Sequence, residues 1–324
     1  MKTSLCSVLG IDAPIVQAPL RPGARAELAA AVSNAGGLGM LGWDDLAGLR
    51  DLIRATRALT SKPFGVNFIL TEEKHDFIQV CMEEGVAAIS FFWGDPAPYV
   101  SRIHDGGAIV MHTVGSAAEA RTSAAGGTDI IVAQGWEAGG HVWGTVATFA
   151  LVPAVVDAVA PKPVVAAGGI SDGRGLAAAL ALGACGAWIG TRFVASEEAW
   201  MHPAYKKRVV DAAETDTVYS SLFDGGWPHA PHRTLRNSTI ERWQKAGSPA
   251  SGARPGEGDV IVTISDRPVH RYSACTPRGD CFGDTEPMAN YAGQSAALIK
   301  EVLPAGEIVA TIVSEAESIL RRLR

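Results

Sequence analysis

Short apolar runs alternate with helix-like segments from the start of the chain to about Phe193. Each run is continuous rather than alternating in polarity, which is typical of parallel strands that are buried on both faces. Eight runs therefore predict strands, at residues 14–20, 37–42, 63–70, 86–93, 108–114, 129–135, 163–169 and 187–193. Capping residues and terminal glycines mark the helices predicted between them, at residues 24–34, 44–59, 72–84, 116–125 and 172–182.

Eight strands with interleaved helices predict a closed (β/α)8 TIM barrel, an α/β fold in which all strands are parallel. The length of 324 residues suits one such barrel with an insertion. An open doubly wound sheet is the alternative architecture.

The pattern changes after Phe193. Residues 194–213 predict a helix, whereas residues 214–285 are rich in Gly, Pro, Asp and Arg and show no clear period. Residues 289–301 and 305–323 are helix-like again. We therefore expect a barrel over 1–213, an irregular excursion over 214–285 that packs over the active-site end, and C-terminal helices over 286–324 that complete the barrel.

Composition and charge narrow the choice of partners. A net charge of -6 argues against binding to nucleic acid or to an anionic membrane, so a small-molecule partner is expected. No apolar run approaches the roughly 20 residues that span a bilayer, and the N-terminus lacks a run of signal-peptide length. The five cysteines are scattered, which is typical of a reducing compartment. We expect a cytoplasmic protein, either a monomer or a homodimer.

Glycines stand at the ends of the seventh and eighth predicted strands. The seventh strand runs into Gly168-Gly169, and the eighth runs into Gly190-Thr191. Glycine lets backbone N–H groups approach an anion closely, and phosphate sites after strands seven and eight recur in this fold. Taken singly, each glycine would suit a tight turn. Taken together, they predict a phosphate site.

The sixth strand runs into a glycine-rich segment that ends in Gly139-Gly140-His141. Reactive groups of a barrel lie at the carboxyl ends of its strands, and an imidazole there could remove a proton or orient an anion. We therefore predict that His141 is catalytic. The alternative is a structural histidine bonded to a loop carbonyl.

Three amide side chains lie within predicted strands or at their ends, namely Gln17, Asn67 and Gln134. A buried amide needs partners for both its oxygen and its nitrogen. A polar ligand edge would supply them, and so would the neighbouring backbone, so the pattern leaves both roles open.

For the other polar candidates, the sequence does not predict a specific functional role. His112 lies in a strand and is interpreted as a core histidine. The excursion contains His229 and His232 in a run without a metal-ligand pattern, so no metal site is predicted. Arg233 and Arg236 are either structural or substrate-facing.

With these residues laid out, the chain resembles the nitronate monooxygenase family, formerly called 2-nitropropane dioxygenases. The resemblance covers nearly the whole chain and includes PIVQAPL, AVSNAGGLGMLG, PFGVNF, VAQGWEAGGHVWG, PVVAAGGISDGRGLAAALALGA, WIGTRF and YAGQSAALI. The order EAGGH, AAGGI and GTRF is specific to a wider group of flavin barrels. That group also contains FMN-dependent enoyl-acyl carrier protein reductases and NADH:quinone reductases.

The resemblance implies a bound FMN and the oxidation of alkyl nitronates, the anions of nitroalkanes, by O₂ to carbonyl compounds and nitrite. His141 matches the active-site histidine, which contacts the nitronate and acts as a base on a neutral nitroalkane. The positions that match flavin contacts are Ala18, Pro19, Asn67, Gln134 and Gly139. The positions that match the phosphate site are Gly169, Trp188, Ile189, Gly190 and Thr191. Tyr291 and Gln294 lie in a C-terminal motif that the family places near the pocket.

Departures from the family pattern concern the substrate. Leu20 stands where many relatives carry methionine, and its bulk would alter the space above the flavin. Trp136 and Trp143 flank the Gly-Gly-His turn, where many relatives have small or charged residues. We therefore take both tryptophans and Tyr291 as candidate substrate contacts. An NAD(P)H-dependent reductase of quinones or enoyl thioesters is the alternative function, and a non-catalytic flavin-binding protein is the third.

Overall fold

The computed structural model describes residues 1–42 and 45–323. Eight parallel strands form one sheet in the order β1-β9-β8-β6-β5-β4-β3-β2. They are β1 (Ile15–Gln17), β2 (Gly39–Leu41), β3 (Phe64–Ile69), β4 (Ala88–Phe92), β5 (Ile109–Val114), β6 (Ile130–Gln134), β8 (Val164–Ala167) and β9 (Gly186–Ile189). The two end strands also meet, since the Gln17 N–H donates to Leu38 O and the Leu38 N–H to Ile15 O, both at 2.9 Å. The predicted TIM barrel is therefore confirmed, and the open sheet is wrong.

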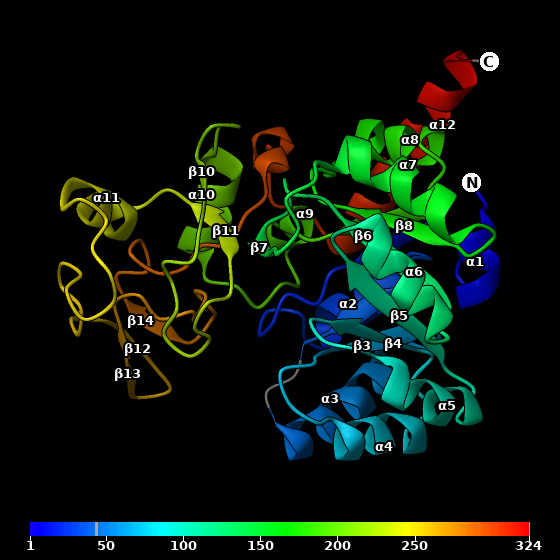
Figure 1. The fold of residues 1–324 in the computed structure, drawn as a ribbon, viewed down its shortest axis with the longest axis horizontal. Helices are drawn as coiled ribbons and strands as arrows, with labels where there is room; N and C mark the ends of the chain where they lie inside the picture. The colour runs from blue at the N-terminus through cyan, green and yellow to red at the C-terminus, as the bar shows by residue number, and fades with distance from the viewer. Residues whose placement is uncertain (43–44, 324) are drawn as a thin grey trace.

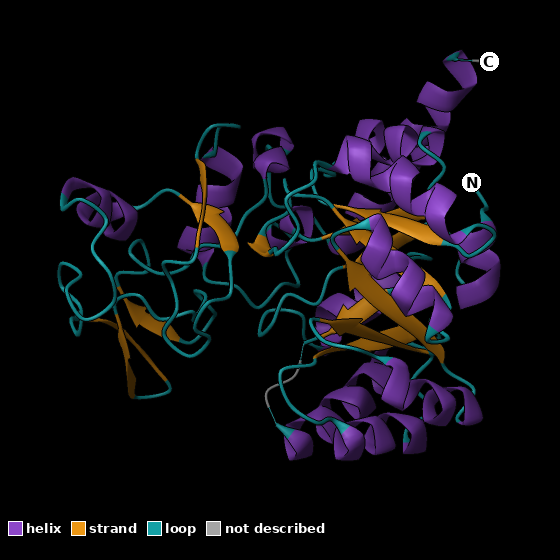
Figure 2. Ribbon diagram, in the orientation of Figure 1, coloured by secondary structure: helices purple, strands orange, loops and turns teal. Residues whose placement is uncertain are grey.

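Helices surround the strands of the barrel (Figure 2). Five lie within three residues of their predicted bounds: α2 (Ala26–Asn34), α3 (Leu46–Leu59), α4 (His75–Glu83), α6 (Ala117–Ala125) and α8 (Gly173–Ala181). The predicted start of α3 at residue 44 lies outside the described residues. The side chains of Asp45, Ser116 and Asp172 accept backbone N–H groups and so begin three of these helices. Three further helices were not predicted: α1 (Ser4–Leu9), α5 (Ala97–Asp105) and α7 (Thr148–Val159).

Apolar side chains fill both the interior of the barrel and the layer beneath its helices. Val16, Met40 and Val132 belong to an interior cluster that also contains Leu5 and Leu9 of α1. A larger cluster joins the outward faces of the strands to α2, α7, α8 and α12 (Ala305–Arg322). These layers explain why the strands are continuous apolar runs, because both faces of each strand are buried.

Two of the predicted elements near the end of the barrel are wrong in part. Residues 190–193 do not extend the eighth strand, because its neighbour β1 ends at Gln17 and the ladder stops after the bond from Ala18 N–H to Ile189 O. They begin the short helix α9 (Thr191–Val194) instead. The helix predicted over 194–213 is reduced to α10 (Pro203–Asp211), whose first residue is a proline.

The helix predicted over 289–301 is also wrong, whereas the one over 305–323 is confirmed by α12. Residues 289–293 run extended beside β11 (His232–Leu235), where the Leu235 N–H donates to Asn290 O at 2.8 Å. Only a short 3-10 helix, η1 (Gln294–Leu298), follows. Because the backbone of residues 289–293 bonds to β11, it does not form the helical bonds that the sequence pattern predicted.

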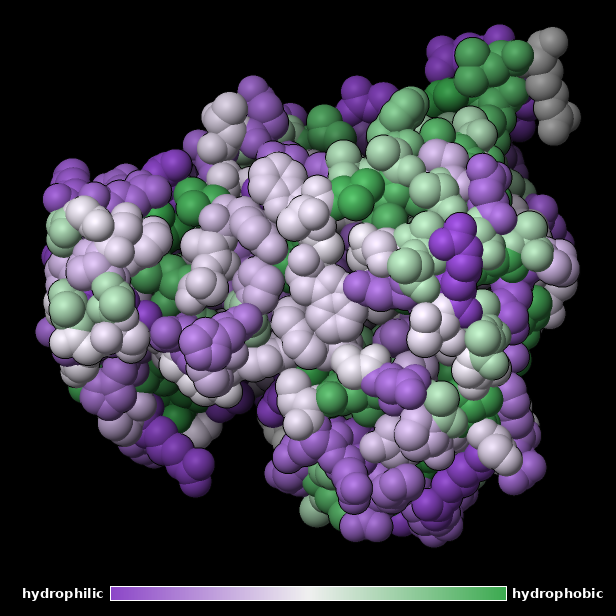
Figure 3. Space-filling model, in the orientation of Figure 1, coloured by the Kyte–Doolittle hydropathy of each residue, from purple (hydrophilic) through white to green (hydrophobic). Residues whose placement is uncertain are grey.

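The excursion forms a separate layer at one side of the barrel (Figure 1). It is not irregular throughout, because it contains β10 (Thr217–Ser220), β11, α11 (Ser238–Lys245), β12 (Val260–Ile264), β13 (Arg267–His270) and β14 (Cys281–Gly283). β11 pairs with β10 and with β7 (Gly140–His141), a two-residue strand in the loop after β6. On the face drawn in Figure 3, a notch at the lower edge lies between the excursion and the barrel, and above it their surfaces are continuous. Within the described residues, no helix has the length and apolar content needed to cross a bilayer.

Candidate active site

A cavity of about 1020 Å³ lies at the carboxyl ends of the barrel strands. Residues at the ends of β1, β3, β6, β8 and β9 line one side of it, and residues of the excursion line the other. This is the end of the barrel at which catalytic groups of the fold lie. The cavity therefore brings together most of the residues that the sequence predicted for the site.

The glycines after β8 form a backbone cradle in this cavity. Gly168 and Gly169 have φ angles of 95° and 73°, a region that residues with a side chain rarely adopt. A Cβ atom on Gly168 would lie 2.9 Å from the Gly135 oxygen, which is closer than such atoms approach. Within the described part of the chain, neither N–H group has a hydrogen-bond acceptor. Two unpaired backbone donors at a glycine turn fit an anionic group such as a phosphate.

Gly190 and Thr191 face the same cavity from the end of β9. The Thr191 hydroxyl accepts the Gly293 N–H at 3.0 Å, so it already fastens the C-terminal segment to the barrel. A Cβ atom on Gly190 would lie 3.4 Å from the Ala18 Cβ, an ordinary contact. The steric requirement for glycine is therefore stronger at residue 168 than at residue 190.

The three amide side chains have different surroundings. Gln17 is fully buried and exchanges bonds with the backbone of Met40, so its role is structural. Asn67 lines the cavity and its Oδ1 atom accepts the Ser90 hydroxyl at 2.6 Å. Gln134 also lines the cavity, and its Nε2 atom donates to His141 O at 3.2 Å. Gln134 thus holds the backbone of the candidate catalytic residue.

The remaining predicted cofactor positions divide into two groups. Ala18, Pro19, Gly139 and Trp188 line the cavity. Gly139 is packed so closely that a Cβ atom there would lie 2.4 Å from the Gly293 nitrogen. Ile189 is fully buried in the core and does not line the cavity. Leu20, the residue that departs from the family pattern, does line it.

His141 lies in the cavity within a shell of aromatic rings. Its ring centroid is 4.0 Å from that of Trp227, 5.5 Å from Tyr291 and 5.6 Å from His232. Its Nδ1 atom is buried and has no hydrogen-bond partner among the described residues. Burial, with a smaller contribution from His232, lowers the pKa of His141 to about 3. At neutral pH the structure therefore presents an uncharged imidazole, which is the protonation state that a proton acceptor needs.

The two tryptophans predicted to contact substrate lie outside the cavity lining. Trp136 packs beneath the guanidinium of Arg233, whose carbon is 4.4 Å from the ring centroid. The Nε1 atom of Trp143 donates to Glu119 Oε2 at 3.2 Å. Among the three predicted substrate contacts, only Tyr291 lines the cavity, and its hydroxyl donates to Ala274 O at 3.0 Å. Burial raises the pKa of Tyr291, so this hydroxyl stays protonated.

Gln294, the other residue of the C-terminal motif, does not line the cavity. Its backbone N–H donates to Glu137 O at 3.0 Å, which fastens the start of η1 to the loop after β6. Ser295, the next residue, does line the cavity, and its hydroxyl accepts the Ser171 hydroxyl at 2.6 Å. The motif therefore reaches the cavity through Tyr291 and Ser295.

Trp227 is the residue that sequence reasoning missed. It belongs to the excursion, lines the cavity and makes the closest ring contact with His141. The run Gly225-Gly226-Trp227 shortly before His229 was the available signal, because it lies in a long loop and binding residues are often found on loops. Its pairing with His141, 86 positions away in the chain, has no local signature.

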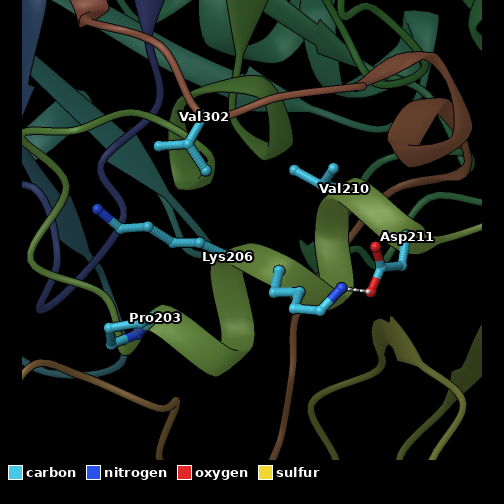
Figure 4. A pocket seen from close by; sticks show the side chains of 6 residues that line it. Pro203, Lys206, Val210, Asp211 and Val302 are labelled. Carbon is cyan, nitrogen blue, oxygen red and sulfur yellow. Dashed lines mark hydrogen bonds and ion pairs between the residues drawn. The ribbon is translucent and has the colours of Figure 1, made fainter.

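A second pocket, of about 370 Å³, lies beside α10 and Val302 (Figure 4). Lys206 donates to the Ser196 and Glu197 carbonyl oxygens at 2.6 and 3.1 Å. Lys207 forms an ion pair with Asp211 at 2.7 Å. Both lysines are already engaged, so this pocket lacks the character of a binding site for an anion.

The chain is similar to known proteins in both sequence and fold. The model of the nitronate monooxygenase family matches residues 2–78 and 73–315. The (3aS,4S,5R,7aS)-5-hydroxy-7a-methyl-1-oxo-octahydro-1H-indene-4-carboxyl-CoA dehydrogenase of Mycobacterium tuberculosis is 40% identical over 260 residues, which are 78% of this chain and 71% of that protein. A nitronate monooxygenase of Paraburkholderia phytofirmans is 33% identical, with coverage of 100% of this chain and 97% of that protein. The structure of FabK from Thermotoga maritima has a TM-score of 0.83 at 35% identity, covering 100% of this chain and 99% of FabK.

The fold defines a TIM-barrel enzyme, and its candidate site lies between the barrel mouth and an added layer. The chain belongs to the nitronate monooxygenase family.

Proposed function

We propose that this enzyme binds FMN in the mouth of the barrel and uses O₂ to oxidise alkyl nitronates to carbonyl compounds and nitrite. The observation that carries the proposal is the uncharged imidazole of His141, whose Nδ1 atom has no partner among the described residues, in the cavity that also contains the glycine cradle. The relative from Paraburkholderia phytofirmans, named a nitronate monooxygenase, supports the same reaction.

The residues present fit the cofactor. The N–H groups of Gly168 and Gly169 would hold the phosphate, and Asn67 and Gln134 would meet polar edges of the ring. Ala18 and Pro19 would lie along the ring face. When bound, FMN supplies the electron transfer between substrate and O₂, while the protein supplies orientation and electrostatics.

His141 accepts a proton from the substrate, and its positive charge then lies beside the anion that results. A neutral nitroalkane becomes a nitronate when a base removes a proton from the carbon beside the nitro group. Neutral His141 accepts that proton. The imidazolium so formed is costly in a buried site unless an anion lies beside it, and the nitronate is that anion.

Aromatic rings around His141 reduce its contact with water. Trp227 and Tyr291 contact its ring, and Trp93 lies 6.3 Å from it. Removing water strengthens the interaction between imidazolium and nitronate, because the local dielectric constant is lower. The aromatic shell thus favours an anionic substrate held against His141.

A second candidate function is the NAD(P)H-dependent reduction of quinones or enoyl thioesters. The observation that favours it is the size of the cavity, about 1020 Å³. Ligand sites commonly enclose roughly 300 to 1,000 Å³, so this cavity has room for a substrate much larger than a small nitronate. It continues beyond the glycine cradle along Ile264, Pro268 and Val269 of the excursion. The relative from Mycobacterium tuberculosis, named a carboxyl-CoA dehydrogenase, is consistent with a large substrate.

A steady-state assay distinguishes the two candidates. FMN-loaded protein is mixed with ethyl nitronate in air, and oxygen uptake and nitrite release are followed. The proposal predicts that both occur without any added nicotinamide. Oxidation of NADH or NADPH coupled to a quinone or an enoyl thioester, with no nitrite from the nitronate, supports the second candidate instead.

A further inference from the structure

We propose that His232 is a positioning residue that clamps the loop of residues 223–230 and thereby holds Trp227 over His141. The structural part of this inference stands on the geometry of the loop alone. Its effect on turnover rests on the proposed function.

The imidazole of His232 joins the two ends of that loop. Its Nε2 atom accepts the Phe223 N–H at 3.2 Å, and its Nδ1 atom lies 2.9 Å from the Ala230 oxygen. A carbonyl oxygen needs a donor and an N–H needs an acceptor, so only the neutral ring with its proton on Nδ1 satisfies both partners. His232 is fully buried, and burial lowers its pKa, so this neutral form is the stable one.

Trp227 lies near the middle of the clamped loop. Its backbone N–H donates to Asp224 O at 3.0 Å, which folds the loop back on itself. Its indole then packs against His141, with 4.0 Å between ring centroids and 42° between ring planes. It also meets Trp93 of the barrel at 5.0 Å. A clamp at the ends of the loop therefore fixes an aromatic ring over the candidate base.

His232 also contacts His141 directly. His141 in β7 and His232 in β11 are Cα partners across an antiparallel pair. Their rings lie 5.6 Å apart at 82°, so the edge of one ring meets the face of the other. The Val142 N–H donates to Pro231 O at 3.0 Å and fixes this register. His141 is thus held by His232 and, through the clamped loop, by Trp227.

The ionisable groups around the pair leave burial as the dominant influence on His141. His232 from β11 and Tyr291 from the C-terminal segment face its ring, and both are uncharged in this structure. Asp224 exerts a small opposing effect on His232, but it forms an ion pair with Arg254 at 2.8 Å. If the loop loosens, water reaches His141 and its pKa returns toward the ordinary value near 6.5.

Nitrogen NMR of ¹⁵N-histidine-labelled, FMN-loaded protein tests the clamp without relying on turnover. In the wild type, His232 should remain the neutral Nδ1–H tautomer from pH 8 to pH 5, and His141 should remain uncharged over that range. In His232→Phe, which keeps a ring but removes both nitrogens, His141 should titrate near pH 6.5. His232→Gln, whose amide can both accept and donate, should restore much of the wild-type behaviour. His112→Asn changes another buried histidine, which lies in β5 and bonds to Ser123 of α6, and it should leave His141 unchanged.

Turnover gives the second readout. If His141 titrates near pH 6.5 in His232→Phe, kcat/KM on a neutral nitroalkane should fall about fourfold between pH 7.5 and pH 6, whereas the wild type stays level. A wild-type His232 that protonates near pH 6.5, or an unchanged His141 titration in a folded His232→Phe protein, would overturn the proposal. If His232→Phe fails to fold, the wild-type tautomer and His232→Gln still decide the matter. A wild type that lacks nitronate turnover but shows the predicted tautomer and titrations would refute the proposed function alone.

Discussion

The guanidinium of Arg233 lies over the indole of Trp136, 4.4 Å from the ring centroid, and its Nη2 atom donates to the Trp136 carbonyl at 2.9 Å. Arg233 belongs to β11 of the excursion, and Trp136 follows β6 of the barrel. The pair therefore joins the two layers beside the active site. This contact explains why Trp136, predicted to touch the substrate, lies outside the cavity lining.

Replacing Arg233 should weaken the fold. Arg233→Met removes the cation–π contact and leaves the Trp136 carbonyl without its charged donor, so the free energy of unfolding should fall by about 2 kcal/mol. Urea denaturation followed by circular dichroism measures this change. Arg236→Met alters an exposed arginine three residues away and should cost little. Equal losses in both variants would show that the contact between the layers contributes nothing.

Gly168→Ala should weaken the binding of FMN. A Cβ atom there would lie 2.9 Å from the Gly135 oxygen and 3.1 Å from the Ala138 nitrogen, and neither backbone atom can move freely. A strain of about 1–3 kcal/mol in the cradle corresponds to a loss of FMN affinity of roughly 5- to 150-fold. Fluorescence titration of the apoprotein with FMN measures it.

Gly85→Ala is the matched control for that variant. Gly85 also has a positive φ, 66°, but a Cβ atom there would have no neighbour within 4 Å. The change should lower stability slightly and leave FMN affinity unaltered. A Gly168→Ala protein that binds FMN as tightly as Gly85→Ala does would contradict the assignment of the cradle.

His141→Ala should keep FMN and lose turnover. The side chain lines the cavity, but the predicted phosphate cradle is built from backbone atoms of other residues. Removing a positioned base typically costs about 10² to 10⁴ in rate, so kcat/KM on a neutral nitroalkane should fall by that factor. Turnover of a preformed nitronate should fall less, because that substrate has already lost its proton. Equal rates in variant and wild type with both substrate forms would remove His141 from the mechanism.

The activity of the wild type on neutral nitroalkanes should not change between pH 7 and pH 5. The base is active when uncharged, and burial lowers the pKa of His141 to about 3, so protonation does not occur between pH 7 and pH 5. The pH profile of kcat/KM should therefore be level over this range. A loss of activity with a midpoint near 6.5 would show that His141 is exposed to solvent in the working enzyme.

The barrel could be predicted from the sequence because its signals are local. Each buried strand is a continuous apolar run, and Asp45, Ser116 and Asp172 cap helices within their own turns. The glycines at 168 and 169 were predicted for the same reason, since a strand end and a turn are both visible in a short window. The missed helix α7 contains Pro153, a residue that disfavours a helix interior.

The wall of the site could not be predicted, because it depends on contacts between distant segments. Trp227 meets His141 only because β11 pairs with β7 in one register. Residues 289–293 gave a helical pattern but run beside β11, where the backbone finds other partners. Trp143, beside the Gly-Gly-His turn in sequence, bonds to Glu119 instead of facing the cavity. Proximity in sequence to His141 was therefore a poor guide to contact with the substrate.

Anaerobic mixing distinguishes oxidation of a nitronate from oxidation of a nicotinamide at the flavin. FMN-loaded protein is mixed in the absence of O₂ with ethyl nitronate and, separately, with NADH and NADPH, while the flavin absorbance is recorded. The account predicts that the nitronate bleaches the flavin faster than either nicotinamide, and that admitting O₂ restores the colour and yields nitrite. Fast bleaching by NADH or NADPH, with none by the nitronate, would contradict it.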